Sequence, residues 1–237
     1  MQERIQKVLS RVGVASRRHA EAYIRDGRVT VNGVLATIGQ LVDAATDVLV
    51  VDGVRIANDQ SLHYVMMYKP RGYAVTRDDP HAAHTVFELL PEALRSHVWY
   101  VGRLDLNSEG LLLFTNDGAL TQELTHPSFA HEKEYIVTVT DRPTTAQGRA
   151  LRSGVMLDDG MASASSLSVH GQTIHLVITE GRKRQVRRMC MAAGMTVERL
   201  VRVRMGGLQL PDDLKSGEFR MITREDVLPS APTKNNP

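Results

Sequence analysis

Hydrophobic and polar residues follow a helical spacing at the start of the chain. One face of a first helix collects the apolar residues Ile5, Val8, Leu9 and Val12, with Gly13 placed to end it. Ser16 is a suitable N-cap for a second helix over residues 17–26, in which Ala20 and Ile24 face inward. Two hairpins follow, with Asn32-Gly33 and Asp52-Gly53 in their turns. The pattern predicts a compact module of two short helices and a small sheet.

Beyond a polar, aperiodic stretch at residues 57–62, the pattern changes to short apolar runs typical of strands. Strands are expected at residues 64–69, 111–114, 134–139, 155–168, 173–179 and 196–208. Helices are expected at residues 119–125, 144–155 and 181–195, the last with Val186, Met189, Cys190 and Ala193 inward. A short helix is also expected within residues 84–94, ending near Pro91. Because strands outnumber helices and do not alternate with them regularly, the fold class is predicted to be α+β with a mixed, mainly antiparallel sheet.

The pattern also predicts the domain organisation. We expect a first domain at residues 1–59, a larger second domain at residues 60–228, and a disordered Pro/Asn-rich tail at residues 229–237.

A single acid in the middle of the chain occupies a position suited to chemistry. Asp105 lies in a Gly-Arg-Leu-Asp turn that precedes the apolar run 111–114, and Asn116-Asp117-Gly118 then offers a helix cap. A loop-borne carboxylate braced by a buried strand is the rigid support that a catalytic group needs. The alternative is a turn aspartate that bonds only to its own backbone.

Composition and charge narrow the class of protein. Apolar residues make up 42% and charged residues 24% of the 237, and the one cysteine, Cys190, excludes a disulfide framework. We expect a soluble, cytoplasmic protein without signal peptide or membrane span. The net charge is only +2, but residues 1–28 carry net +4 and residues 182–204 net +7. Two separate basic segments indicate a polyanion-binding surface, although two solvated basic helix faces would give the same pattern.

Several chemistries lack their motifs. The sequence contains no G-x-G-x-x-G, no G-x-x-x-x-G-K-[ST] and no G-x-S-x-G. His81 and His84 stand three residues apart in a polar loop without carboxylate or thiolate partners, so we expect no metal there.

The N-terminal module resembles a known RNA-binding fold. The stretch SRVGVASRRHAEAYIRDGRVTVNG is similar to the fold first seen in ribosomal small-subunit protein S-four. The resemblance covers residues 1–59. It implies that the first two helices present basic side chains to RNA phosphates, and the candidates are Lys7, Arg11, Arg17 and Arg18.

The second domain resembles the pseudouridine synthases of ribosomal RNA. Five segments agree with the family in order: the Lys-Pro-Arg-Gly turn, GRLD…GLLLFTNDG, THPS, HEKEYIVTV and EGRKRQVRRM. The nearest branch is the RsuA/RluB/RluE/RluF group, which also carries the S-four-like module. Within that branch, the chain length and the N-terminal sequence favour the RluB-like members.

The resemblance implies a role for each candidate residue. Asp105 matches the catalytic aspartate, Arg103 the arginine that helps eject the target uridine, and Tyr135 the tyrosine that stacks on the flipped base. Arg187 matches the arginine that pairs with the carboxylate, and Leu111 or Leu112 is expected to line the pocket. Further RNA contacts are expected from a basic run, Arg182, Lys183 and Arg184.

The implied reaction is an isomerisation, so no cofactor and no metal are expected. It breaks the N1–C1′ bond, turns the uracil and joins C5 to C1′. The carboxylate acts either as a nucleophile at C1′ or as a base at C2′, and the sequence does not decide between them.

The expected partner is ribosomal RNA or a partly assembled ribosomal subunit, bound by a monomer. The large-subunit 23S rRNA is favoured as substrate, and the small-subunit 16S rRNA is the alternative. A non-enzymatic RNA-binding assembly factor is a second hypothesis, because S-four-like modules occur in many unrelated proteins. A nucleic-acid glycosidase is a third, but such enzymes usually need a second carboxylate, and none stands out near Asp105.

Overall fold

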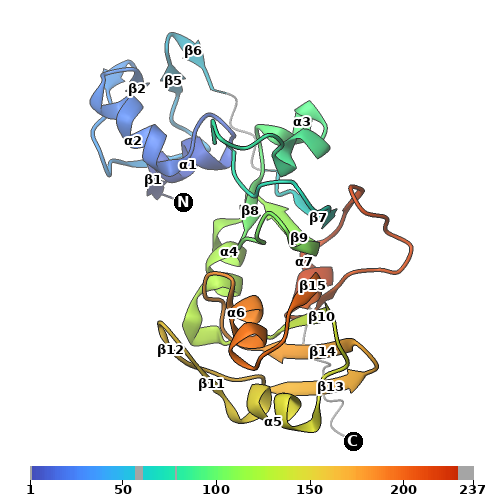
Figure 1. The fold of residues 1–237 in the computed structure, drawn as a ribbon. Helices are drawn as coiled ribbons and strands as arrows, with labels where there is room; N and C mark the ends of the chain where they lie inside the picture. The colour runs from blue at the N-terminus through green and yellow to red at the C-terminus, as the bar shows by residue number, and fades with distance from the viewer. Residues whose placement is uncertain (1, 57–60, 78, 229–237) are drawn as a thin grey trace, which may run out of the picture.

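The computed structural model describes residues 2–56, 61–77 and 79–228 and contains two parts (Figure 1). The smaller, N-terminal part holds two helices and six short strands. These elements are β1 (Gln2–Arg4), α1 (Ile5–Arg11), α2 (Arg17–Arg25), β2 (Val29–Val31), β3 (Val34–Leu35), β4 (Leu41–Asp43), β5 (Leu49–Val51) and β6 (Val54–Arg55). The strands pair as β3-β2-β5-β6 and as β1-β4.

The expected periodicity of this module is largely confirmed. Ile5, Val8 and Leu9 are fully buried, together with the inward residues of α2. The Ser16 side chain accepts a hydrogen bond from the His19 amide at 3.2 Å, as an N-cap should. Both hairpins form, with β2–β3 and β5–β6 antiparallel.

The predicted inward position of Val12 is wrong. Helix α1 ends at Arg11, and Val12 is its C-cap and only half-buried. Gln6 is buried instead and donates to Glu21 at 3.2 Å. The chain leaves the helix at Gly13, whose φ of +81° lets the backbone turn directly onto the second part.

The larger part is built on one nine-stranded sheet. Its strands are β7 (Tyr64–Lys69), β8 (Trp99–Val101), β9 (Glu109–Thr115), β10 (Lys133–Val139), β13 (Ser166–His170), β14 (Thr173–Ile178), β15 (Val197–Met205), β16 (Leu208–Gln209) and β17 (Phe219–Met221). The order is β13-β14-β10-β15-β9-β7-β17, while β8 pairs with β9 and β16 with β15. Only the β15–β9 pair is parallel among the pairs described, so the predicted α+β, mainly antiparallel class is confirmed.

Helices and one extra hairpin surround this sheet. They are η1 (Val86–Leu89), α3 (Glu92–Arg95), α4 (Gly118–Thr125), η2 (Pro127–Phe129), α5 (Thr145–Ser153), α6 (Gln185–Ala192), α7 (Arg224–Val227) and the hairpin β11 (Val155–Leu157)–β12 (Gly160–Ala162). As predicted, Asp117 caps α4, accepting from the amides of Ala119 and Leu120 at 3.0 and 3.1 Å.

Two helix predictions differ in part from the structure. The helix expected within 84–94 does end before Pro91, as predicted, but it is only the short η1, and α3 starts beyond the proline, because Pro91 forces the preceding Leu90 into an extended conformation. The helix expected over 181–195 begins only at Gln185, since Arg184 adopts a left-handed conformation with φ of +51°. Residues 181–184 therefore form a loop.

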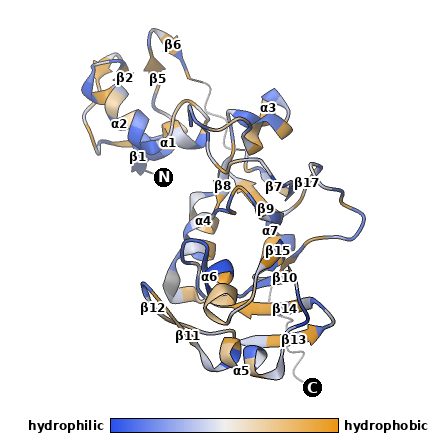
Figure 2. Ribbon diagram, in the orientation of Figure 1, coloured by the Kyte–Doolittle hydropathy of each residue, from blue (hydrophilic) through white to orange (hydrophobic). Residues whose placement is uncertain are grey.

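Strand β9 is the buried centre of the sheet. Its apolar run alternates between two cores, with Leu112 and Phe114 on one face and Leu111 and Leu113 on the other. This explains why the run is continuous rather than alternating. Figure 2 shows the same hydrophobic colour on β14, while α6 carries both hydrophilic and hydrophobic stretches.

The two parts touch through the end of α1. The Trp99 indole donates to the Ser10 carbonyl at 3.3 Å, and the Asn116 amide donates to the Arg11 carbonyl at 3.4 Å. Gly13 packs against the backbone of Ser96, so closely that a Cβ there would lie 2.3 Å from the Ser96 carbonyl oxygen. The N-terminal module is thus seated on β8 and the turn before it.

Three expectations fall partly or wholly outside the described residues. They are the linker at 57–62, the domain boundary at 59–60 and the tail at 229–237. Within the described ranges, no cluster of three or more His, Cys, Asp or Glu residues could hold a metal ion. None of the helices in those ranges is long and apolar enough to cross a membrane.

Candidate active site

A cleft of about 1080 Å³ opens on the larger part of the protein. It is lined by the loop before β9, by one face of β10 and β15, by the end of α4 and by the loop between β14 and α6. A smaller hollow of about 380 Å³ lies in the N-terminal module, between residues 44–48 and 55–56, away from every candidate residue of the larger part. The cleft is therefore the candidate active site.

The loop that carries Asp105 is anchored at both ends. Leu104 is buried in the core on one side, and the Ser108 amide donates to the Asp105 carbonyl at 3.0 Å on the other. Just beyond, Gly110 has a φ of +103°, and a Cβ there would lie 2.2 Å from the Arg202 carbonyl oxygen. This glycine allows β15 to approach β9, which fixes the loop against the sheet.

Lys69 holds the same loop through hydrogen bonds to its backbone. Its ammonium group is fully buried and donates to the carbonyls of Pro70 at 2.9 Å, Leu106 at 3.3 Å and Ser108 at 2.8 Å. Burial lowers the pKa of Lys69 to about 8, and the carboxylates of Glu109 and Asp105 limit the shift. A buried cation thus ties the Lys-Pro-Arg-Gly turn to the loop of Asp105.

Arg103, Asp105 and Tyr135 line this one cleft. Asp105 is half-buried and Arg103 is exposed, whereas Tyr135 on β10 is 8% exposed. The geometry therefore places an acid, a cation and an aromatic ring around a single hollow.

Arg187 is not among the residues that line the cleft, but it contacts the loop that carries Asp105. From α6, its guanidinium donates to the Asn107 carbonyl at 2.6 Å and to the Val197 carbonyl at 3.4 Å. No hydrogen bond from Arg187 to Asp105 is present in the described structure. Burial and the charge of Arg184 lower the pKa of Arg187, while Asp105 opposes the shift, so the two groups feel each other electrostatically.

The expectation that Leu111 or Leu112 lines the pocket is wrong. Both side chains are fully buried in the two cores beside β9. The leucines that line the cleft come from neighbouring elements: Leu104, Leu106, Leu124 and Leu200.

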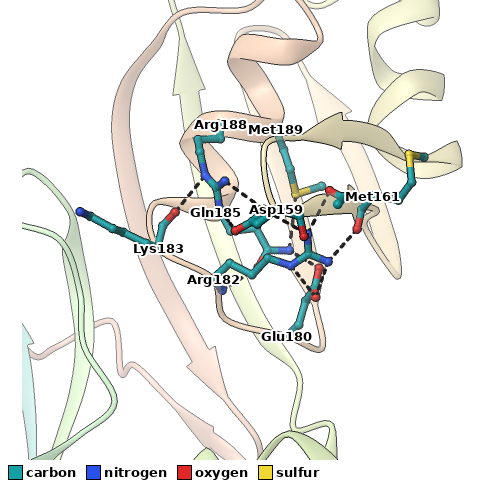
Figure 3. A network of polar contacts seen from close by, with 9 residues as sticks. Asp159, Met161, Glu180, Arg182, Lys183, Gln185, Arg188 and Met189 are labelled. Atoms are coloured by element: carbon teal, nitrogen blue, oxygen red, sulfur yellow. Dashed lines mark hydrogen bonds and ion pairs between the residues drawn. The ribbon is translucent and has the colours of Figure 1, made fainter.

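The basic loop between β14 and α6 is held by a network of ion pairs (Figure 3). Arg182 donates to Glu180 at 3.0 Å and to the Met161 carbonyl at 2.7 Å, and also reaches Asp159 at 3.3 Å. Arg188 donates to both carboxylate oxygens of Asp159, at 3.0 and 2.8 Å. The hydrogen bond from Arg188, followed by Arg182, lowers the pKa of Asp159 to about 2.

This network separates the three basic residues predicted to contact RNA. The guanidinium of Arg182 is occupied by protein acceptors, whereas Lys183 and Arg184 are exposed at the mouth of the cleft. Arg182 therefore anchors the loop to the protein, and this anchoring leaves the side chains of Lys183 and Arg184 exposed at the cleft.

The basic residues of the N-terminal module that were predicted to contact RNA also fall into two groups, one paired with an acid and one exposed. Lys7 and Arg11 both form ion pairs with Glu3, the first at 2.7 Å. Arg17 and Arg18, in the first turn of α2, are exposed. The second pair therefore offers the freer positive charge.

The sequence reasoning missed three cleft or loop residues. Lys69 appears there only at the end of a predicted strand and in the turn after it, Lys133 only within the HEKEYIVTV motif, and Arg202 only as a member of a strand, although Lys133 and Arg202 line the cleft with Tyr135. For Lys69 the available signal was a cation at the end of an otherwise apolar run, since buried charges are rare without partners. Lys133 and Arg202 lie among other charged residues, so the sequence offers no such signal for them.

Two family models match this chain. That of the S4 domain matches residues 3–49, and that of RNA pseudouridylate synthase matches residues 63–192, more than half of the chain. The chain belongs to the RNA pseudouridylate synthase family. The synthase described here thus carries both parts that its sequence resembled.

Curated relatives agree over nearly the whole synthase. It is 43% identical over 236 residues to a Pseudomonas aeruginosa protein named ribosomal large subunit pseudouridine synthase B, covering 95% of this chain and 61% of the relative. A relative of the same name from Escherichia coli K12 is 43% identical over 228 residues, covering 92% of this chain and 78% of the relative. The synthase thus spans about three fifths to four fifths of their lengths.

A solved structure supports the fold. The crystal structure of a pseudouridylate synthase superposes with a TM-score of 0.69 at 28% identity, covering 94% of this chain and 97% of the other.

Proposed function

We propose that this synthase isomerises a uridine of 23S ribosomal RNA to pseudouridine. The observation that carries the proposal is that Asp105, on a loop braced by Lys69 and Arg187, lines the same cleft as Tyr135 and Arg103. The names of the curated relatives favour the large subunit over the small one.

The chemistry assigns Asp105 to the ribose. Its carboxylate attacks C1′ or removes the C2′ proton, and in either route the N1–C1′ bond breaks and the uracil is released inside the cleft. The base then turns and C5 bonds to C1′, while the Asp105–C1′ ester bond breaks in the first route, or C2′ takes back its proton from Asp105 in the second. The C5 proton is then lost and N1 gains a proton. Nothing is oxidised or reduced, so residues of this chain are sufficient for the reaction.

Tyr135 and Arg103 provide for the base. The Tyr135 ring, buried in the cleft wall, gives an aromatic face on which the detached uracil is retained. Extruding a base from an RNA helix costs a few kcal/mol, and Arg103, exposed beside Asp105, fills the space that the uridine leaves.

Arg187 acts on Asp105 mainly through position and charge. It holds the backbone two residues after the acid, at Asn107, and the charge of Asp105 acts on it by raising the pKa of Arg187 against the effects of burial and Arg184. We therefore propose that Arg187 is a positioning residue, which acts on the reaction through Asp105.

The basic residues at the two ends of the chain bind the RNA backbone. Lys183 and Arg184 act at the mouth of the cleft, and Arg17 and Arg18 act from the N-terminal module, which is assigned to residues 1–59. Lys7 and Arg11 contribute less, because Glu3 already neutralises part of their charge. The monomer is the proposed working unit.

Replacing the acid tests the proposal. Purified Asp105→Asn should form no detectable pseudouridine in 23S rRNA fragments, yet bind them as the unaltered protein does, because the amide keeps the shape but cannot act on C1′ or C2′. Pseudouridine is mapped chemically, in vitro and in rRNA from a strain lacking the gene.

Other outcomes identify the competing functions. An unchanged pseudouridine map in the deletion strain, with a cellular role retained by residues 1–59 alone, would favour an assembly factor. Release of free uracil without pseudouridine would indicate a glycosidase. Loss of modification in 16S rather than 23S rRNA would move the substrate to the small subunit.

A further inference from the structure

Arg202 is a buried cation with most of its hydrogen-bonding capacity unused. It lies on β15 with 2% of its surface exposed, and it lines the cleft. Its Nε donates to the Leu111 carbonyl at 2.9 Å, while its Nη2 is buried without a hydrogen-bond partner. No ion pair joins Arg202 to a carboxylate in the described part of the chain. A buried charge left in this state costs free energy unless a ligand completes it.

Two neighbours define where such a ligand would sit. Arg202 is the cross-strand partner of Tyr135, so both side chains project from the same face of the sheet into the cleft. Lys133 lies two residues before Tyr135 on that face, and within the described residues its ammonium donates to the His131 carbonyl alone, at 2.9 Å. Both cations line the same cleft. Burial, followed by the charge of Arg202, lowers the pKa of Lys133.

We propose that Arg202, assisted by Lys133, binds the anionic uracil that is released in the cleft and stabilises its negative charge. This inference rests on the proposed function and assigns a catalytic residue in addition to Asp105. It identifies the ligand as a pyrimidine mono-anion seated against Tyr135.

The charge balance of the reaction creates this anion. When the N1–C1′ bond breaks, both electrons leave with the base, and the negative charge spreads over N1, O2 and O4. The matching deficit at C1′ is met by the Asp105 carboxylate, or by the electron pair left when the C2′ proton moves to Asp105. Both routes place one negative charge on the uracil until C5 forms the new bond. A preorganised guanidinium in a water-poor cleft stabilises such a charge without reorganisation.

The position of Arg202 favours the base over a phosphate. Arg202 is almost completely buried beside the tyrosine, at the level of the central strands, whereas Lys183 and Arg184 are exposed at the mouth of the cleft. A flat ring edge can reach a guanidinium at that depth more readily than a tetrahedral phosphate on a polynucleotide backbone. The exposed cations are the better phosphate ligands.

A matched pair of variants on one strand tests the inference. Arg202→Met removes the cation inside the cleft, and Arg204→Met removes one outside it, which is bonded to Glu132 and Glu134 at 2.9 and 3.0 Å. We expect Arg202→Met to lower the single-turnover rate about 100-fold with RNA affinity unchanged. Its melting temperature should equal or exceed that of the unaltered protein, because an uncompensated buried charge is lost. Arg204→Met should keep its rate and lose melting temperature.

A substrate with 5-fluorouridine at the target position gives a second measurement. Its result should not change if Arg202 only stabilises the fold. Fluorine makes the departing base less basic, so its release depends less on a neighbouring cation. The ratio of the unaltered to the Arg202→Met rate of N1–C1′ cleavage should therefore shrink with this substrate. Lys133→Met should show a smaller rate loss that shrinks in the same way.

The remaining outcomes overturn the inference. An unchanged rate in Arg202→Met, or weaker RNA binding with a normal saturated rate, would assign Arg202 to packing or to phosphate binding. If Arg202→Met does not fold, a normal rate in Lys133→Met would have the same consequence. If the unaltered protein itself makes no pseudouridine, the proposed function fails first; pseudouridine formed equally by both variants refutes this inference alone.

Discussion

At the scale of single residues, buried cations are placed where the reaction needs a rigid loop and a stabilised charge. Lys69 holds three carbonyls, Arg187 holds the loop at Asn107, and Arg202 lines the cleft wall. Each lies on a regular element or at its end, so its position is set by the sheet or by α6 rather than by a flexible loop. The acid itself, Asp105, is supported almost entirely through backbone.

Lys69→Met should weaken both the fold and the reaction. The methionine fills the site but leaves the Pro70, Leu106 and Ser108 carbonyls without their donor, at a cost of about 1–3 kcal/mol in the free energy of unfolding. Because the loop of Asp105 loses its brace, the pseudouridylation rate should fall more than RNA affinity does. Denaturant unfolding and single-turnover assays measure the two effects.

Lys69 also predicts a pH dependence. Its pKa is about 8 in the folded protein and 10.5 when unfolded, so between these values the unfolded chain holds more protons. The stability of the unaltered protein relative to Lys69→Met should therefore rise as pH increases from about 8 to 10.5. Denaturant titrations of both proteins across this range test the sign, and a relative loss of stability would refute the buried cation.

At the scale of elements, the loop between β14 and α6 shows where local sequence patterns fail to predict secondary structure. The basic run 181–184 continues the composition of a helix, and the sequence was interpreted that way. Tertiary contacts decided otherwise, because Arg182 finds acceptors on the β11–β12 hairpin and Arg184 adopts a left-handed conformation. The strands of the sheet were predictable because their apolar runs report burial directly.

Asp159→Asn should loosen this loop. The amide is uncharged and cannot accept from both Arg182 and Arg188 as the carboxylate does, so Lys183 and Arg184 lose their fixed presentation at the cleft mouth. We expect a several-fold weaker affinity for rRNA fragments, a smaller change in saturated rate, and little change in melting temperature. Asp158 is the exposed neighbour of Asp159, so Asp158→Asn is the control and should bind rRNA fragments normally. Equal affinity of the two variants would show that the brace has no role in binding.

At the scale of the whole molecule, RNA binding and chemistry are joined by a small contact. The end of α1 meets β8 and the turn before it through Ser10, Arg11 and Gly13. Arg77 reinforces this surface by lying over the Trp99 ring at 4.1 Å. The contact sets the distance between the exposed arginines of α2 and the cleft, which an RNA must span.

Gly13→Ala should disturb that spacing. Its Cβ would meet the Ser96 carbonyl at 2.3 Å, so the module must shift. We expect weaker binding of rRNA fragments long enough to reach α2, with a normal rate at saturation. Gly39→Ala, which has a similar φ of +80° but open space around it, shares only the backbone cost of about 1 kcal/mol and should bind normally. Matching affinities would show that the seating of the module is unimportant.

The sequence by itself determined the two-part organisation, the central strand, the caps of α2 and α4, and the acid, aromatic and basic candidates. These depend on local spacing, side-chain type and motif order, all of which are written along the chain. The tertiary structure alone decided that Lys69 is a brace, that Arg182 is occupied and that Arg202 lies beside Tyr135 with no carboxylate partner among the residues described. The reason is physical: burial and partnership of a charge depend on segments distant in sequence, and only the packed sheet brings them together.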